Sequence, residues 1–399
     1  MSATKALAGD SQTAKNVIGK KDVSVNILAI AAFIIVTTEF LIVGLLPAIA
    51  RDLAVSVVTV GQLVTLFALV VMLAGPFLTA MLVNFERKSL FIFILLLFAV
   101  SNALAAVAPN IWVLALARFI PALALPVFWG TASETAAQLA NPSQEGKAVA
   151  KVYLGISAAM LLGIPLGTLA ADVIGWRGAF ALLAGMSCFT ALLMHLFMPS
   201  VQKNTSIAVN TQVKILKSPY FISNLLLSIV IFTAMFSGYT YLAEFLEKTV
   251  KVAPTQVGWW LMGFGAIGLL GNWLGGLWVD KKPLFTTAVF SFVMALGMIA
   301  AMLFAHDKVV FAVALAVWGI ANTALYPICQ IRVMKAASGA QALAGSLNVS
   351  AANGGIAFGA MLGGLSITTL GIEVIGYVAA SIAIIAICFI PIVAKLRHG

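Results

Sequence analysis

The chain has 399 residues, of which 62% are hydrophobic and 9% are charged. Soluble domains carry roughly 25% charged residues, so the composition excludes a soluble protein and indicates one that crosses a membrane repeatedly. The net charge is +10, but the basic residues gather in short segments between apolar runs, which explains the charge without a nucleic-acid partner. Cys188, Cys329 and Cys388 stand alone in apolar runs and predict neither disulfides nor a metal site.

Twelve apolar stretches follow one another, each long enough to cross a bilayer as a helix. Polar residues 1–22 precede them and are expected to form a mobile cytosolic tail. The predicted helices cover 25–48, 56–82, 89–107, 111–138, 151–172, 179–199, 219–245, 255–279, 284–305, 309–334, 341–368 and 374–394. Residues 200–218 are interpreted as a cytosolic linker between two halves, 23–199 and 219–399. The predicted fold class is an all-α membrane protein with twelve transmembrane helices in two pseudo-symmetric six-helix bundles, which is a transporter plan.

Lysine and arginine are distributed unequally between the two sides of this bundle. With the N-terminus in the cytosol, most of them fall in cytosolic segments, among which we count Arg332 at the end of the tenth stretch. Cytosolic loops carry the excess of basic residues in membrane proteins, so both termini are expected in the cytosol. The expected surroundings are a lipid bilayer, and the chain is expected to be a monomer.

Glu39 is the one acidic residue deep inside a predicted span. A carboxylate at membrane depth costs a few kcal/mol unless it is protonated, paired or facing a wet cavity. We therefore predict that Glu39 carries a proton that drives solute transport; the alternative is a structural carboxyl group hydrogen-bonded between helices. Glu134 and Glu244 lie near helix ends, where a place at the cavity mouth stays open.

Arg118 is the basic residue left inside a span, and it is the natural partner for Glu39. At 1.5 Å per residue, the depths of the two residues differ by roughly 3 Å. We predict a switch in which ionised Glu39 is held by Arg118 and protonated Glu39 is released. The alternatives are a static ion pair, or an arginine bonded only to helix carbonyls.

Small residues recur every four positions in the fifth span, at Gly155, Ala159, Gly163 and Gly167. Such a face lets another backbone approach closely, and Pro165 permits a bend because it removes a hydrogen bond. The face predicts either ordinary close packing or a pliable seam against the other half, with the glycine-rich stretch 341–368 as its counterpart.

Aromatic and amide side chains on the helices expected to line the cavity are the candidate substrate ligands. They are Phe128, Trp129, Tyr239, Tyr241, Gln330, Asn348 and Asn353. Aromatic walls with a few amides suit uncharged or weakly cationic organic molecules, although ordinary packing explains each residue equally well. Trp259 and Trp260 are predicted to anchor their helix at the membrane interface.

Several motifs carry a resemblance to a known family. They are Thr37–Phe40 with Gly44–Pro47, Leu114–Phe119, Gly163–Gly167, Gly175–Arg177 and Ser346–Gly355. With them the chain resembles the major facilitator superfamily, and within it the twelve-span drug/proton antiporters of the bacterial arabinose-efflux-permease-like group. The first loop departs from the family pattern, because Thr79 and Val83 replace its glycine and aspartate; the second half keeps Gly276 and Asp280, which we assign to the conformational motif together with Gly163, Pro165 and Gly167.

The resemblance implies a proton-coupled antiporter of the bacterial inner membrane that exports small organic molecules such as drugs, sugars or nucleosides. The coupling ion is the proton and no cofactor is expected. An importer or facilitator with the same fold is the alternative. An intramembrane enzyme and a channel are disfavoured, because the spans show neither a nucleophile–base or metal constellation nor a ring of like charges.

Overall fold

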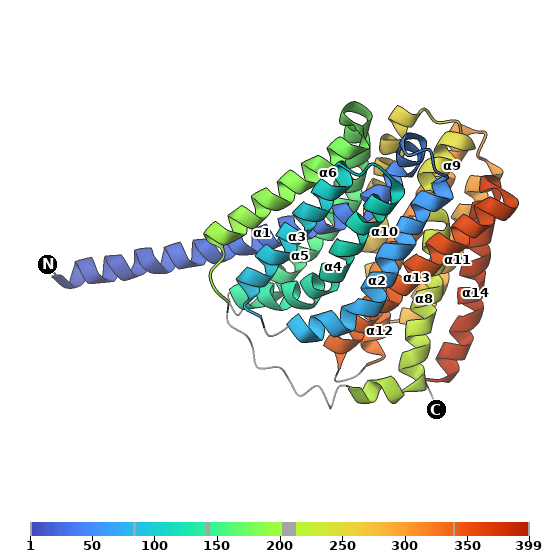
Figure 1. Ribbon diagram of the computed structural model, residues 1–399. Coiled ribbons are helices and arrows are strands. Elements are labelled where there is room, and N and C mark those ends of the chain that lie inside the picture. Colours follow the sequence, from blue (N-terminus) through green and yellow to red (C-terminus); the bar gives the residue numbers. More distant parts are fainter. Residues whose placement is uncertain (1, 83–84, 141–143, 202–212, 338–339, 398–399) are drawn as a thin grey trace.

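The computed structural model describes residues 2–82, 85–140, 144–201, 213–337 and 340–397, and every regular element in these ranges is helical. The elements are α1 (Ser2–Asp52), α2 (Val57–Leu82), α3 (Arg87–Ala106), α4 (Ile111–Leu139), α5 (Glu145–Ala158), η1 (Ala159–Gly163), α6 (Ile164–Phe197), η2 (Val213–Lys217), α8 (Pro219–Tyr239), α9 (Leu242–Lys248), α10 (Pro254–Val279), α11 (Pro283–Leu303), α12 (Lys308–Lys335), α13 (Gln341–Leu370), η3 (Ile372–Val374) and α14 (Ile375–Lys395). The long helices lie side by side in one bundle (Figure 1).

Ten stretches in the described part of the chain are long and apolar enough to cross a membrane. One of them, Lys147–Phe197, has 51 residues and would measure about 77 Å as a single helix, more than twice the roughly 30 Å of the hydrocarbon core. Gly175 divides it, with φ 74° and ψ 161°, a conformation that favours glycine. Glycine, serine and asparagine lower the hydropathy of α13, which is long enough to span with its 30 residues. The predicted all-helical fold with twelve crossing helices is thus confirmed.

The first helix begins earlier than predicted. Residues 2–22 continue α1 instead of forming a separate tail, and Figure 1 shows these turns projecting beyond the bundle. The composition explains the difference, since alanine, lysine and glutamine favour helix and no proline interrupts the segment. In the expected linker, residues 202–212 lie outside the described part, and residues 213–217 form a 3₁₀ helix.

The helices pack in two groups. Helices α1–α6, the N-terminal group, contact one another, and helices α8–α14, the C-terminal group, do likewise. The two groups meet where α2 packs on α13, α6 on α10 and α1 on α9. The exact domain bounds 23–199 and 219–399 stay a prediction. We refer to the two ends of the bundle by a charged residue at each, the Arg51 end and the Asp280 end.

Candidate functional site

Glu39 lies on α1, whose membrane stretch is the most buried of the candidate spans in the described chain. The helix contacts α2, α4, α5 and α6 of its own group and α9 and α10 of the other. Glu39 itself is 8% exposed, and the adjacent Thr37 and Thr38 are buried as well. The carboxyl group is therefore removed from lipid and solvent, in a helix that touches both groups.

The Arg118 side chain of α4 contacts the main chain of Glu39 and not its carboxylate. One guanidinium nitrogen donates a hydrogen bond to the carbonyl oxygen of Thr38 and another to that of Glu39, both at 2.5 Å. The ring of Phe67 covers the guanidinium at 4.5 Å and adds a cation–π contact. Among the ion pairs of the described residues, none joins the Arg118 guanidinium to the Glu39 carboxylate. In this arrangement the arginine is bonded to helix carbonyls, which was one of the alternatives left open by the sequence.

Asn102 of α3 extends this site. Its side-chain amide donates to the hydroxyl of Thr38 at 3.0 Å, so that α3, α4 and α1 meet at one turn of α1. Sequence reasoning missed Asn102 and Phe67. The signal for Asn102 was present, because an asparagine in the apolar span 89–107 requires a hydrogen-bond partner between helices.

An aromatic cluster beside Glu39 joins the two groups. We define the central aromatic cluster as Phe40, Phe236, Tyr239 and Phe264. Phe40 contacts Phe236 with 5.7 Å between ring centroids, Phe236 contacts Tyr239 at 5.7 Å, and Tyr239 stacks on Phe264 at 5.4 Å. Phe236 and Tyr239 lie on α8 and Phe264 on α10, so Phe40, the residue after Glu39, contacts the C-terminal group.

The other predicted substrate ligands pack elsewhere. Phe128 contacts Phe91 of α3, and Trp129 contacts Phe128 and Tyr153, all within the N-terminal group. The structure thus places Tyr239 in the same aromatic cluster as Phe40, the neighbour of Glu39, while Phe128 packs inside the N-terminal group.

The remaining polar candidates donate hydrogen bonds to acceptors inside the C-terminal group. Asn348 donates to Gln330 at 2.7 Å, and Asn353 donates to the carbonyl of Val349 in its own helix. Tyr241 donates to the carbonyl oxygen of Ala360 at 2.9 Å, and its ring fills the space beside Gly61 of α2. Their role as substrate ligands stays a prediction.

The small face of the fifth span packs against α1, and the predicted seam with the other half is wrong for these glycines. A side-chain carbon at Gly163 would meet Thr37, and one at Gly167 would meet Leu41. Gly155 likewise faces the α1 backbone. A repeat of four identifies a close-packed face but carries no information on which helix covers it.

Glycines of α10 make one of the close approaches between the groups. Gly258 faces Leu169 and the carbonyl oxygen of Pro165, and Gly265 faces the carbonyl oxygen of Met160. In the expected counterpart, α13, Gly355 and Gly359 pack against α8 of its own group, whereas Gly354 and Gly364 face α2 of the N-terminal group. The π-helical turn η1 ends two residues before Pro165, which has no N–H to continue the ordinary pattern, so the backbone is irregular where α10 meets it.

The Asp280 end carries the residues of the loop motif. Lys335 pairs with Asp280 at 2.8 Å, which ties the end of α12 to the end of α10, and Gly276 is exposed with open space around it. In the first half, Val83 lies outside the described residues. Arg87 pairs with Glu134 at 3.0 Å, which ties α3 to α4.

Arg332 was assigned wrongly to a cytosolic segment. It lies inside α12, is 1% exposed, and donates to the hydroxyl of Ser228 at 2.8 Å and to the carbonyl of Asn224 at 3.1 Å. The helix continues past the apolar stretch to Lys335, so position near a helix end did not mean exposure.

Glu86 caps the N-terminus of α3 at the same end of the bundle. Its carboxylate accepts hydrogen bonds from the N–H groups of Lys88 at 3.1 Å and Ser89 at 2.7 Å. Burial by itself raises the pKa of Glu86, but these hydrogen bonds outweigh it and hold the pKa below its ordinary value.

The Arg51 end is closed by charged residues. Arg51 of α1 pairs with Glu247 of α9 at 2.5 Å and so joins the two groups, whereas the neighbouring Asp52 pairs with Arg177 inside the N-terminal group. Glu244 and Lys248 line a cavity of about 160 Å³ next to Arg51, so Glu244 does face a cavity at this end.

Comparisons with known proteins agree with this architecture. The model of the Major Facilitator Superfamily matches residues 28–340 and 225–398. The inner membrane transport protein YdhP of Escherichia coli K12 is 34% identical over 364 residues, covering 90% of this chain and 94% of the relative. A probable sugar efflux transporter of Helicobacter pylori J99 is 30% identical over 361 residues, covering 90% and 92%. A bacterial homologue of the human lysosomal transporter Spinster, solved inward-facing and unoccupied, shares the fold with a TM-score of 0.82 at 14% identity, over 94% of this chain and 97% of that one. The chain is a multi-pass inner-membrane transporter and belongs to the Major Facilitator Superfamily.

Proposed function

We propose that this transporter is a proton-coupled antiporter that exports small organic molecules by alternating access. The observation that carries the proposal is Glu39, a carboxyl group buried in the helix that contacts both groups and beside the central aromatic cluster. Such a group is expensive to keep inside a membrane, which favours a functional role. The relatives named as probable sugar efflux transporters support export, and the substrate class comprises drugs, sugars or nucleosides.

Arg118 links the proton to the position of α1. While its guanidinium is bonded to two main-chain oxygens, the Glu39 carboxyl group has no ionic partner there and is most stable with its proton. Loss of the proton creates a carboxylate that attracts the guanidinium. As Arg118 turns to it, the hydrogen bonds to the α1 backbone are given up, and the contact between α1 and α4 loosens. Because α1 also packs on α9 and α10, this change reaches the other group.

The closed Arg51 end bears on the side from which substrate enters in this state. We assign this end to the periplasm and the Asp280 end, with both termini, to the cytosol, in line with the distribution of basic residues. The Arg51–Glu247 pair and the Gly258–Pro165 approach then close the periplasmic side. Substrate binds from the cytosol in this state, and protons from the periplasm load Glu39 after the groups have rocked.

Transport in proteoliposomes tests the proposal. Vesicles with an imposed pH gradient are loaded in parallel with a sugar (arabinose), a nucleoside (inosine) and a drug (chloramphenicol), and substrate and proton fluxes are recorded together. We expect opposite fluxes of protons and of at least one probe in the wild type. Glu39→Gln should abolish the gradient-driven flux, while the matched control Glu373→Gln, at an exposed carboxylate in η3, keeps it.

Two outcomes would contradict the proposal. Undiminished gradient-driven flux in Glu39→Gln would remove Glu39 from the coupling step. Substrate and protons moving in the same direction would identify an importer.

A further inference from the structure

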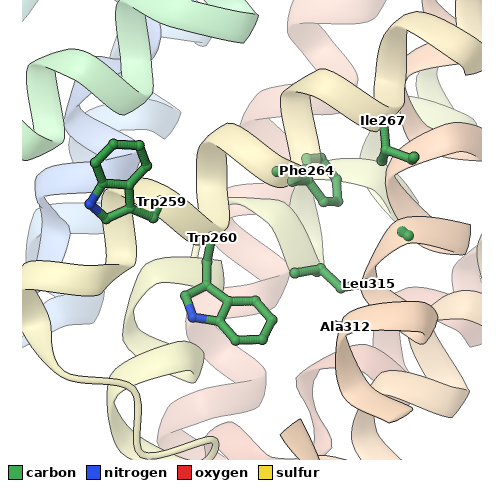
Figure 2. Close-up of a pocket in the computed structure, with 8 residues that line it drawn as sticks. Trp259, Trp260, Phe264, Ile267, Ala312 and Leu315 are labelled. Atoms are coloured by element: carbon green, nitrogen blue, oxygen red, sulfur yellow. The ribbon is translucent and has the colours of Figure 1, made fainter. Parts of the chain in front are cut away.

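A groove lies between α10 and α12 at their Arg51 end. It has a volume of about 320 Å³, and its walls include Trp259, Trp260, Phe264, Ile267, Ala312 and Leu315. Figure 2 shows Trp260 and Phe264 of α10 on the side of Leu315 of α12, and Trp259 further from α12. Both helices belong to membrane spans, and Trp259 is 61% exposed, so the open side of the groove faces the bilayer.

Small residues create the groove and bound it. Further along the pair, Gly268, Gly271 and Gly275 bring α10 into close contact with α12, which closes the space between the helices. Within the groove, a side-chain carbon at Gly263 would have no neighbour within 4 Å, and α12 offers Ala312. The groove is therefore a result of how α10 and α12 pack, and it ends where the close glycine contacts begin.

Phe264 connects the groove with the site around Glu39. One side of its ring forms a wall of the groove, while the ring also stacks on Tyr239 and meets Trp318 edge-on at 5.6 Å. Tyr239 belongs to the central aromatic cluster, which continues through Phe236 to Phe40, the residue after Glu39. Phe264, which is 5% exposed, thus belongs both to the wall of the bilayer-facing groove and to the central aromatic cluster.

We infer that this groove binds uncharged, ring-bearing molecules dissolved in the bilayer and passes them beyond Phe264 to the other rings of the central aromatic cluster. The inference rests on the proposed export function and names one class of its substrates. The walls are apolar and aromatic, so a charged or sugar-like molecule would lose its hydrogen bonds without replacement. The volume lies at the lower end of the range for small-molecule sites, which fits a compound of two or three rings. Ring faces of Trp260 and Phe264 supply stacking contacts for such a compound.

Photolabelling tests the binding without any transport. Benzophenone, an uncharged two-ring ketone that partitions into membranes, is irradiated with the purified full-length protein in proteoliposomes, and labelled peptides are mapped. We expect label in residues 259–267 and 312–316. Gly263→Leu places a side chain in the groove and should reduce this label at least tenfold. Gly185→Leu is the matched control, because this glycine of α6 is also exposed with no neighbour within 4 Å, and it should leave the label unchanged.

Export of an apolar probe tests the passage. In cells that produce each variant, we expect Gly263→Leu to slow efflux of the uncharged dye Nile red at least fivefold relative to Gly185→Leu. Label that persists in Gly263→Leu would overturn the binding site. Label that is lost while Nile red efflux stays at the Gly185→Leu rate would show that the groove takes only adventitious lipid or probe, and would also overturn the inference. If Glu39→Gln keeps its proton-driven flux while Gly263→Leu loses both label and Nile red efflux, the coupling scheme fails and the groove is supported.

Discussion

Arg51 of α1 and Glu247 of α9 form an ion pair, with 2.5 Å between Nη1 and Oε2, that joins the two helix groups at one end of the bundle. The adjacent residue, Asp52, forms its own pair with Arg177 inside the N-terminal group. Two neighbouring residues at the end of one helix therefore make equivalent bonds with different consequences. The first has to break when the groups separate at this end, and the second does not.

Removing the Arg51–Glu247 pair should favour the state open at the Arg51 end. The Arg51 side chain is 54% exposed, so the pair contributes at most about 1 kcal/mol, which corresponds to roughly a fivefold change in the population ratio. Val173 and Val309 are exposed positions on α6 and α12 and can carry spin labels. In double electron–electron resonance, we expect Glu247→Gln to shift the distribution of distances between these two labels towards longer values.

Asp52→Asn is the control for this measurement. It removes a pair of the same kind at the same end but within one group, and should leave the distribution unchanged. Equal shifts in both variants would mean that loss of charge, and not loss of the link between groups, is responsible.

Lysine should not replace Arg118. The guanidinium donates to two consecutive main-chain oxygens and lies over a ring, and an ammonium group cannot reproduce that fork. We expect Arg118→Lys to lower gradient-driven flux in proteoliposomes at least tenfold although the charge is kept.

Asn102→Ala is the control for Arg118→Lys. It removes a single hydrogen bond to Thr38 and should lower the free energy of unfolding by about 1 kcal/mol while flux stays within about twofold. Wild-type flux in Arg118→Lys would show that charge alone is needed at this position and would contradict the proposed link to the α1 backbone.

How much of the site can be predicted from the sequence depends on the kind of interaction. Glu39 was predictable because a charge at membrane depth stands out against apolar neighbours. The bond of Arg118 was not, since main-chain oxygens are present at every residue and leave no pattern. The central aromatic cluster draws on α1, α8 and α10, so chain order alone could not assemble it.

The sequence also did not predict which helices pack against each other. Helix number and the close-packed face of the fifth span follow from composition and spacing, whereas the choice of α1 as partner depends on how the helices are arranged. The burial of the charged Arg332 was likewise not predictable, because its hydrogen-bond partners, Ser228 and Asn224, lie about a hundred positions earlier in the chain.

Glu86 should contribute to stability in a pH-dependent way. Its pKa is lowered on folding by the hydrogen bonds of the α3 cap, so the carboxylate stabilises the folded state above the ordinary pKa of 4.5, and this contribution is lost as the pH falls through the lower, folded-state value. The group is exposed, so the effect is small. We expect Glu86→Gln to lower the free energy of unfolding by roughly 0.5 kcal/mol at pH 7, a typical value for an exposed cap.

The pH dependence distinguishes this cap from other effects of the substitution. In denaturant titrations of the detergent-solubilised protein, the difference between wild type and Glu86→Gln should shrink as the pH is lowered from 7 to 3. A difference that stays constant over this range would mean that ionisation of Glu86 plays no part in it.

Gly163 should tolerate no side chain unless α1 gives way. A side-chain carbon there meets the hydroxyl oxygen of Thr37 and lies 3.1 Å from two further carbons of that residue. We expect Gly163→Ala to lower the free energy of unfolding by about 1–3 kcal/mol, the usual cost of overpacking. At the open position Gly185, the same change to alanine should be neutral or stabilising by up to about 1 kcal/mol, because alanine favours helix.

The double variant Gly163→Ala with Thr37→Ala identifies the cause. Removing the hydroxyl and methyl groups of Thr37 frees the space that the new side chain needs, so most of the loss should be recovered, and the two changes should couple by at least about 1 kcal/mol in a double-mutant cycle. Thermal unfolding followed by tryptophan fluorescence measures each variant. Additive losses would show that Gly163 is needed for its own backbone and not for the contact with Thr37.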